Sequence, residues 1–580
     1  MKEHPAGTKG TPTTGHRSSL PGAHTLDAIT GRFSLTERLL FIGFLIVALI
    51  GVLLIIWDIQ RSFIVTVPAY DGTLIEGMVG TPGPINPLLA SSAPDRALTS
   101  LVYSGLMKAD PEGSLTHELS EQHSVSEDGT EYTFILRDDV LFHDGESVTA
   151  DDVVFTVEKA KDPAVRSDLQ ADWSGIDVRA DDERTVVFSL SEPQEEFMEL
   201  TTLGILPEHI WRSVDSNRFA FSVLNTEPIG SGPYKIDSIT YEQNNPERYT
   251  LKANEDYVRG KPYIATLQFP FFDTEREALQ ALQRGEINAL SGISPERAEF
   301  ISDQNTRVHS TPLPRVFAIF INQNNNEALA DRDVRAALSR AIDRERIVSE
   351  LLHGHGTALT GPLPPRKNET ATNSPEDDED GSPEELLREA GWEYDEELGG
   401  LSEDGESILS IEITTVTNED LMRAVEIVKQ NWAHLGVEVD TAFYGATDLN
   451  QNVLRPREFE GLLFGYILDR DFDLYPYWHS SQRNDPGMNM SLYTDITVDG
   501  LLEDLRNTSD PEEREELRTT VGEHIRDDVP AFFLYAPNFI YAVPESLENA
   551  AFGHLPSAEE RFLNIHEWII ETDTIWSFLL

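Results

Sequence analysis

The sequence contains one uncharged run of nineteen residues, LLFIGFLIVALIGVLLIIW, at positions 39–57. As a helix this run would be about 28 Å long, close to the thickness of the hydrocarbon core of a bilayer. A secretory signal has a shorter apolar region, followed by small residues at a cleavage site. Here Trp57 ends the run and the sequence DIQRSF follows. We therefore predict an uncleaved transmembrane anchor over 39–57.

Basic residues are distributed unevenly around this run. Those before it are Lys2, Lys9, Arg17, Arg32 and Arg38, and the one that closely follows it is Arg61. An excess of Lys and Arg marks the cytoplasmic side of a membrane segment. We therefore expect residues 1–38, rich in Gly, Thr, Ser and Pro, to form a disordered cytoplasmic tail. Residues 58–72 would be a short tether, and the remainder would lie outside the membrane.

The composition of the 580 residues restricts the class of protein. This length exceeds what one hydrophobic core normally serves, so we expect two or more lobes. A net charge of −56 argues against nucleic acid as a partner, because phosphate binding requires a basic surface. The acidity fits either a strongly hydrated surface or attraction of cationic solutes. The sequence has no Cys, which excludes disulfides, thiolate metal sites and a lipid-modified Cys.

Apolar periodicity beyond the anchor is that of a mixed α/β chain. Apolar runs predict strands at 132–137, 185–190, 265–272, 315–322, 407–416 and 531–543. Apolar residues spaced three and four apart predict amphipathic helices at 271–285, 331–352, 419–436 and 511–528. The sequence has no nucleophile elbow, phosphate loop or zinc-protease motif. We therefore predict no enzymatic activity, no cofactor and no metal site.

The stretch YTFILRDDVLFHDGESVTADDVVFTV, residues 132–157, places His143 and several acids beside apolar residues. Alternation over 132–137 predicts a strand with one buried face. Further along, Thr149 is expected to cap a helix, with Asp152 at the third helical position as a short form of the capping box. Each polar side chain then has a local structural role, so we interpret the stretch as scaffold rather than as a metal or acid/base site.

As a whole pattern, SEDGTEYTFILRDDVLFHDGESVTADDVVFTVEKA at 126–160 resembles the signature of extracellular solute-binding proteins of family 5, the receptors of peptide and nickel ABC importers. Further segments resemble the same family in order along the chain: IGSGPYKI (229–236), ALQRGEINAL (281–290), FINQNNNEALADRDVRAALSRAIDRERIV (320–348), LLREAGW (386–392), WAHLGVEV (432–439) and NMSLYTDITVDGLLEDL (489–505). Asn288 replaces the Asp that is usual in its segment. The likeness extends from about residue 70 to residue 580.

The resemblance implies an α/β, two-lobed periplasmic-binding-protein type II fold with an extra domain inserted in lobe I, preceded here by one N-terminal transmembrane helix. Carried over to this chain, lobe I would comprise 68–112, 229–310 and 536–580, the inserted domain 113–228, and lobe II 311–535. The segments 315–322 and 531–543 would cross between the lobes and form the hinge.

The resemblance also implies a ligand site. Peptide-binding members carry a W-x-x-D motif in lobe II, whose Asp pairs with the α-amine of the ligand. In the segment GYILD, Tyr466 and Asp469 stand at those two positions, with Tyr in place of Trp. The Asp-Pro pair that follows in the family is replaced by residues 470–473, so Asp471 and Asp473 are alternative cleft acids. The structural alternative for Asp469 is a turn cap.

Four further residues are assigned to ligand contact by the resemblance. Trp478, His479 and Ser480 belong to a segment that is similar to the cleft-rim F-H-S-S of the family, and Tyr103 lies in LVYSGL, which resembles V-Y-E-x-L on lobe I. The alternative for His479 is a loop histidine with structural partners. Several Arg are candidates for binding a peptide carboxylate.

We therefore predict a membrane-anchored, extracytoplasmic substrate-binding protein of an ABC importer, which binds peptides in an interlobe cleft and delivers them to the permease by hinge closure. Its partners would be a peptide ligand and the permease subunits. It would be a monomer in the cell membrane, single-pass, with a cytoplasmic N-terminus. The alternatives are the same fold binding a nickel chelate, heme or an oligosaccharide, and a non-transport surface chaperone or sensor.

Overall fold

The structure is a computed structural model that describes residues 34–576 apart from 195–196, 244, 302–304, 366–380, 404, 406, 509 and 554. The chain divides into two compact units. The first comprises the residues up to Val67 together with those from Thr572 onward, and the second comprises Pro68–Glu571. The apolar run lies in the first unit, and the sheets and helices of the mixed α/β part lie in the second.

The first unit contains helix α2, Leu35–Phe63, which includes the whole apolar run. The helix begins where Ser34 donates from its backbone N and its Oγ to the Glu37 carboxylate, at 2.9 and 2.8 Å. Such a contact satisfies donors that the first turn of a helix leaves unpaired. Within α2, Leu35–Ile55 is long and apolar enough to cross a membrane, and none of it is buried inside the protein.

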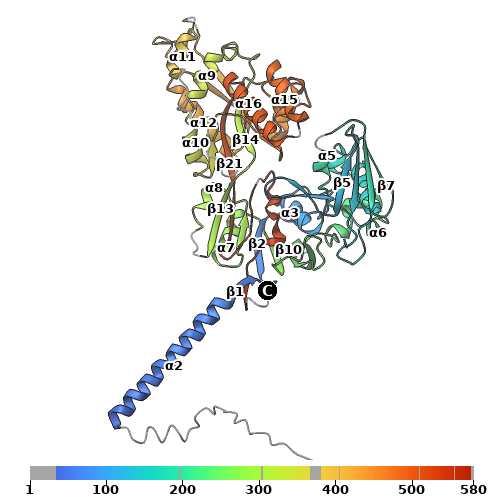
Figure 1. The fold of residues 1–580 in the computed structure, drawn as a ribbon. Helices are drawn as coiled ribbons and strands as arrows, with labels where there is room; N and C mark the ends of the chain where they lie inside the picture. The colour runs from blue at the N-terminus through green and yellow to red at the C-terminus, as the bar shows by residue number, and fades with distance from the viewer. Residues whose placement is uncertain are drawn as a thin grey trace, which may run out of the picture. The chain divides into compact units, whose positions relative to one another are not determined.

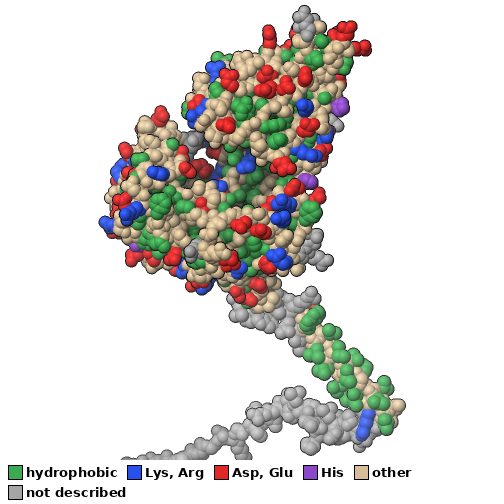
Figure 2. Space-filling view, turned by 180° about the vertical axis from the view of Figure 1, so that it is seen from behind, with side chains coloured by type: hydrophobic (Ala, Val, Ile, Leu, Met, Phe, Trp, Pro, Cys, Tyr) green, Lys and Arg blue, Asp and Glu red, His purple; other side chains and the backbone are tan. Residues whose placement is uncertain are grey.

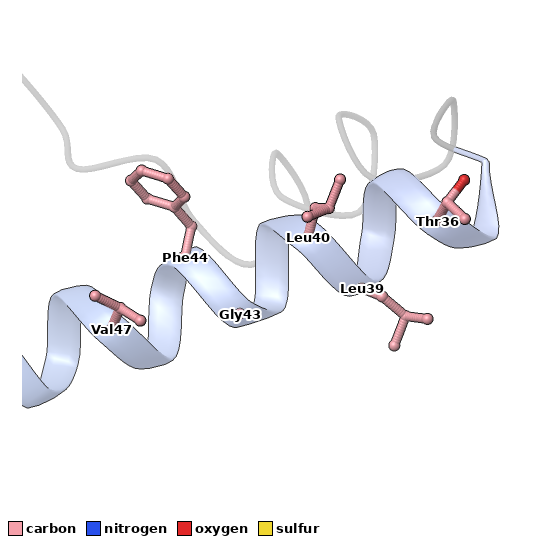
Figure 3. Close-up of a pocket in the computed structure, with 6 residues that line it drawn as sticks. All are labelled: Thr36, Leu39, Leu40, Gly43, Phe44 and Val47. Atoms are coloured by element: carbon pink, nitrogen blue, oxygen red, sulfur yellow. The ribbon is translucent and has the colours of Figure 1, made fainter.

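A pocket lies along α2 and is lined mainly by apolar side chains (Figure 3). Leu39, Leu40, Phe44 and Val47 line it and are exposed. Exposed Leu, Phe and Val suit contact with lipid tails. This pocket is therefore part of the apolar surface of the helix that suits a membrane. Its lining lacks the converging polar groups that a solute site requires.

Most of the segment predicted as a tether, residues 58–72, has regular secondary structure. Residues 58–63 continue α2, because Gln and Arg are good helix formers. The β-branched residues that follow form strand β1, Ile64–Pro68, which pairs with β22, Thr572–Trp576. Of the predicted disordered tail over 1–38, residues 35–38 belong to α2, and residues 1–33 lie outside the described part of the chain.

The second unit is built on one twelve-stranded sheet. Its strands are β2 (Thr73–Val79), β9 (Tyr234–Glu242), β10 (Asn245–Ala253), β11 (Thr266–Phe272), β12 (Ala289–Ser291), β13 (Thr306–Pro312), β14 (Arg315–Ile321), β15 (Gly356–Ala358), β18 (Ser410–Val416), β19 (Glu438–Tyr444), β20 (Gly461–Ile467) and β21 (Ala531–Pro544). The main path runs β19-β18-β20-β14-β21-β12-β2-β11-β10-β9, and β13 and β15 also pair with β21.

Strand β21 belongs to both halves of this sheet (Figure 1). Its residues 531–535 pair with β14, and its residues 538–544 pair with β13. The chain also passes between the halves at residues 313–314, which join β13 to β14. We call the half around β2 and β9–β13 lobe I, and the half around β14, β15 and β18–β20 lobe II. The crossing predicted within 315–322 therefore lies just before that segment.

Three helices of lobe I lie on its half of the large sheet. Lobe I also contains a second sheet, which has four strands. The helices are α3 (Ala93–Val102), α7 (Glu275–Gln283) and α8 (Pro295–Ala298). The small sheet has the order β5-β6-β8-β7, formed by β5 (Ser120–Val125), β6 (Glu131–Leu136), β7 (Ile176–Ala180) and β8 (Thr185–Leu190). With it lie α4 (Ala150–Lys161), α5 (Phe197–Leu200), α6 (Glu208–Trp211) and the hairpin of β3 (Met107–Ala109) and β4 (Leu115–His117).

Lobe II has a buried sheet covered on both faces. Along β14, Ile319 and Ile321 join one apolar cluster, whereas Ala318 and Phe320 join another, as the alternation of side chains along a strand requires. The covering elements are α9 (Arg332–Arg340), α10 (Arg344–Leu351), α11 (Pro383–Glu389), α12 (Glu419–Ala433), α13 (Ala446–Leu449), α14 (Tyr475–Trp478), α15 (Ile496–Asn507), α16 (Pro511–Asp528) and the hairpin of β16 (Glu393–Asp395) and β17 (Gly400–Ser402).

The single helix predicted over 331–352 is two helices, α9 and α10. The break has a local cause, because the Asp343 side chain accepts a hydrogen bond from the backbone N of Arg346 at 2.9 Å and so caps α10. The next residue, Arg344, is buried and donates from Nε to the backbone oxygens of Leu359 and Phe533 at 2.8 and 2.7 Å. These contacts fix the start of α10 and interrupt the helical pattern.

The scaffold interpretation of residues 132–157 agrees with the structure. The Asp152 carboxylate accepts from the backbone N and the hydroxyl of Thr149, both at 2.8 Å, at the start of α4. The ring nitrogen Nε2 of His143 lies 3.0 Å from the backbone oxygen of Gly232. Burial lowers the pKa of His143 to about 4, so this side chain is neutral at physiological pH. The acids and the histidine hold local structure together.

Candidate ligand site between the lobes

The predicted ligand residues of lobe II follow one another along the segment after β20. Residues 468–474 form a loop, α14 follows it, and a short 3-10 helix, Ser480–Gln482, ends the segment. Figure 2 shows the surface of the 68–571 unit hollowed between its two halves, with acidic, basic and apolar side chains at the edge of the hollow. A concave surface with a few polar groups is where a solute is expected to bind.

Tyr466 lies at the end of β20 with its side chain enclosed in the core of lobe II. Its hydroxyl donates to the backbone oxygen of Pro362, and its ring stacks on Tyr477 with centroids 4.5 Å apart. Burial raises the pKa of Tyr466 well above its ordinary value, so the hydroxyl stays protonated. In this conformation Tyr466 fixes the start of the following loop.

Asp469 is exposed at that loop and also shapes it. Its Oδ1 accepts a hydrogen bond from the backbone N of Asp473 at 2.9 Å. Phe472, between them, has a φ of 55°, the left-handed conformation of a tight turn. The turn-cap alternative is therefore observed, and it leaves the carboxylate at the surface, where a cationic ligand group can reach it.

The two alternative acids differ in their surroundings. Asp471 is exposed, and its Oδ2 lies 3.9 Å from Nη2 of Arg514. Asp473 is less exposed and forms an ion pair with Arg506, whose guanidinium lies 3.9 Å from the centroid of the Tyr475 ring. Because the charge of Asp473 is already compensated by Arg506 within lobe II, Asp471 is the better placed of the two to bind a solute.

The rim segment is held by its own contacts. Trp478 is fully buried in this conformation and packs against Phe320 and Phe533 in the core of lobe II. His479 is also buried: its Nδ1 lies 2.8 Å from Oγ of Ser481. His479 thus has a structural partner at Nδ1, and its contact with a ligand stays a prediction.

Asp499 of α15 organises the same segment. It accepts from the backbone N of Ser480 at 2.8 Å and from the Ser480 hydroxyl. Its other contact is with Nε2 of His479, at 3.8 Å. Ser480 and His479 thus link the rim segment to α15. In this conformation both side chains help to hold the rim segment in its shape.

Tyr103 lies at the C-terminal end of α3 in lobe I and is buried. A Cβ added at Gly204 would lie 2.7 Å from its Cβ, and one added at Gly230 would lie 2.9 Å from its ring. Glycines are required at both positions because the backbone approaches the tyrosine closely. Burial raises the pKa of Tyr103, and the predicted cleft-facing role is not visible in this conformation.

A group that the residue types alone did not single out is Arg470. Its Nη2 lies 2.8 Å from Oε2 of Glu560, and its Nε lies 3.4 Å from Oε1 of Glu199. Glu560 belongs to the short helix η8, Ala558–Phe562, on lobe I, and Glu199 belongs to α5. The residue after the predicted amine-binding Asp therefore connects lobe II to the other half of the unit. The signal in the sequence was the replacement of the Asp-Pro pair of the family by residues 470–473.

Helix η8 is held on lobe I by two further ion pairs. Arg561 donates from Nε and Nη2 to Oε1 of Glu76, at 3.0 and 2.7 Å, with both side chains buried. The hydroxyl of Tyr541 donates to Oε2 of the same glutamate at 2.7 Å. On the outside, Nε of Arg96 lies 2.7 Å from Oε1 of Glu559. Glu560 is thus presented from a fixed element.

The described residues contain no group of three or more His, Asp or Glu side chains arranged to hold a metal ion.

Known proteins resemble this chain over most of its length. The family described as bacterial extracellular solute-binding proteins, family 5 Middle, matches residues 85–497, more than half of the chain. The oligopeptide-binding protein AppA of Bacillus subtilis (strain 168) is 29% identical over 515 residues, covering 86% of this chain and 92% of AppA. The dipeptide-binding protein of Escherichia coli (strain K12) is 25% identical over 496 residues, covering 80% and 89%.

Solved structures share the fold. AppA from Bacillus subtilis in complex with a nonapeptide gives a TM-score of 0.62 at 28% identity, covering 87% of this chain and 100% of that chain. NikZ from Campylobacter jejuni in complex with Ni(L-His) gives the same TM-score, identity and coverage. The predicted α/β, two-lobed fold of the periplasmic-binding-protein type is confirmed.

Proposed function

Because this chain belongs to the bacterial extracellular solute-binding proteins of family 5, we propose that it binds peptides between its lobes and passes them to the permease of an ABC importer. The observation that carries the peptide assignment is the exposed carboxylate of Asp469 in the loop after β20. A carboxylate in a narrowing cleft suits an ammonium group, because charge-assisted hydrogen bonds are the strong ones. We propose no catalytic activity for the chain, and a monomer as its working form.

The ligand would lie between lobe I, predicted as 68–112, 229–310 and 536–580, and lobe II, residues 311–535, with 113–228 as the inserted domain. Of these, the residues from Thr572 onward belong to the first unit and not to lobe I. Asp469 would hold the α-amine, with Asp471 beside it. Closure would bend the two crossings, at residues 313–314 and in the middle of β21. Contacts made only in the closed form would shift the population from open to closed.

A second candidate ligand is a nickel–histidine chelate. NikZ, solved with Ni(L-His), is as similar to this chain as AppA is. The experiment that separates the two ligands is identification of the solute that the purified full-length chain retains. A series of peptide masses supports the first proposal, whereas a single nickel-containing adduct supports the second.

We further propose that α2 anchors the binding unit to the cell membrane, with residues 1–38 cytoplasmic and the lobes extracytoplasmic. The support is the span Leu35–Ile55 together with the excess of basic residues before it. The full-length chain is expected in the membrane fraction after an alkaline wash, because transfer of this apolar span into water is strongly unfavourable. A variant that lacks residues 39–57 is the matched control and is expected to be soluble. Recovery of a mature chain that starts after residue 57 from the medium would contradict the anchor.

A further inference from the structure

The ion cluster at Arg470 joins the two halves of the binding unit. One guanidinium of lobe II meets two carboxylates, Glu560 of η8 and Glu199 of α5, at 2.8 and 3.4 Å. The side chains of Arg470 and Glu560 are only 13% and 14% exposed. Arg470 lies on lobe II and the two glutamates lie on lobe I, so separation of the lobes would part the guanidinium from both carboxylates.

The carboxylate of Glu560 has no freedom to follow Arg470 away from lobe I. Its two neighbours in η8 form ion pairs with different elements of lobe I. Glu559 pairs with Arg96 of α3, and Arg561 pairs with the buried Glu76 of β2. Its own Oε1 accepts from the hydroxyl of Ser557 at 3.1 Å. Separation of the lobes therefore breaks the contact of Arg470 with Glu560.

The cluster contains more negative than positive charge. The groups that face Glu560 are Arg470 from lobe II, Glu199 from α5, and Ser557 and Glu559 from its own segment. Asp471, next to Arg470, adds a further negative charge near Glu199. Arg96 compensates Glu559, and Arg514 lies near Asp471. One guanidinium then serves two partly buried carboxylates, Glu560 and Glu199, which leaves one charge in excess.

We propose that closure of the lobes takes up one proton at this cluster and that Glu560 holds it, so that the closed form is favoured as the pH falls. This inference rests on the lobe closure of the proposed function. It adds a coupling between ligand capture and external pH. The excess charge gives the physical reason, because an uncompensated carboxylate at low exposure is costly and a proton removes the charge.

The direction of the pH effect follows from the two conformations. In the conformation observed, burial raises the pKa of Glu560 from its ordinary value of 4.5 to about 7 despite the attraction of Arg470. In the proposed open form Glu560 would face water and return toward its ordinary pKa. Burial raises the pKa of Glu199 as well. Between these two values the closed form binds a proton that the open form does not, so closure strengthens as the pH falls from about 7 to about 4.5. Below and above this window the effect is constant.

The test is the distance between the lobes as a function of pH. The natural chain has no Cys, so two spin labels can be placed without other changes, at Phe221→Cys and Ile496→Cys, two side chains that are 87% and 89% exposed. We expect the ratio of closed to open full-length chain, in detergent micelles without added ligand, to rise by up to about tenfold per pH unit on going from pH 7 to pH 5. Glu560→Gln should remove this dependence, because the amide is neutral in both forms.

Glu559→Gln is the matched control, since Glu559 is the adjacent acid in η8 but pairs within lobe I. It should keep most of the pH dependence of the wild type, because burial, and not the charge of Glu559, is the largest cause of the raised pKa of Glu560. A closed fraction that does not change with pH, that falls toward acid, or that still changes with pH in Glu560→Gln overturns the inference. Addition of a mixed tripeptide library shows which of the two proposals has failed. If the distance between the labels shortens but does not depend on pH, the proposed function stands and only the proton coupling is rejected. If the distance changes under no condition, lobe closure itself is rejected.

Discussion

Arg561→Met is expected to lower the free energy of unfolding by about 3–5 kcal/mol, because it leaves the carboxylate of Glu76 buried without its cation. In the native protein Glu76 is completely buried and receives two hydrogen bonds from Arg561 and one from Tyr541. Methionine fills a similar volume but carries no charge. Urea unfolding of the full-length chain, followed by tryptophan fluorescence, measures the change from the midpoint and the slope of the transition.

Two variants show whether the effect belongs to the buried charge. Arg96→Met removes the other ion pair of η8, but Arg96 is 43% exposed, so the expected loss is below about 1 kcal/mol. Adding Glu76→Gln to Arg561→Met removes the stranded charge and is expected to recover about half of the loss. If Arg561→Met unfolds within about 1 kcal/mol of the wild type, the buried pair is not what fixes η8 on lobe I.

Asp469→Asn is expected to weaken the binding of short peptides by about 2 kcal/mol or more, roughly thirtyfold in affinity. The substitution removes the charge that would pair with the α-amine. It keeps a side-chain oxygen that can accept the hydrogen bond from the backbone N of Asp473, so the loop should retain its shape. Isothermal titration of the full-length wild type and variant with the same peptide gives the difference directly.

Asp471→Asn is the control within the same loop, because Asp471 is also exposed and lies two residues away. If it causes the larger loss, Asp471 is the amine ligand and the assignment moves to it. An affinity unchanged in both variants would mean that the α-amine is not bound by this loop. N-acetylated peptide offers a ligand-side check, because it should bind the wild type as weakly as the free peptide binds Asp469→Asn.

Much of the fold was predictable from local pattern. The run 531–543 corresponds to β21, Ala531–Pro544, and the pattern over 511–528 corresponds to α16, Pro511–Asp528. In each, the apolar period and the flanking turn residues agree with the tertiary structure. The helical pattern over 331–352 did not reveal the break between α9 and α10, where Asp343 caps α10 and Arg344 makes buried hydrogen bonds to two distant carbonyls.

The site was less predictable than the fold. The motif position of Asp469 could be assigned by resemblance, but the partners of Arg470 could not, because Glu199 and Glu560 approach it only after three separate segments have folded. The sequence also did not reveal which of the predicted site residues are buried. Tyr466 and Trp478 have residue types that suit ligand contact, yet the structure encloses both in the core of lobe II. Sequence reports which chemistry is available, and the packing decides which side chains a solute can reach.

The most direct test of the central claim is native mass spectrometry of the full-length chain, purified in mild detergent without denaturation. The account predicts a distribution of bound masses that correspond to short peptides and that disappear after unfolding and refolding. Fragmentation of the released species would then give amino-acid sequences. A single adduct of constant mass that contains nickel or no amino acids beyond one histidine would contradict the peptide assignment, and the proposed role of Asp469 would fall with it.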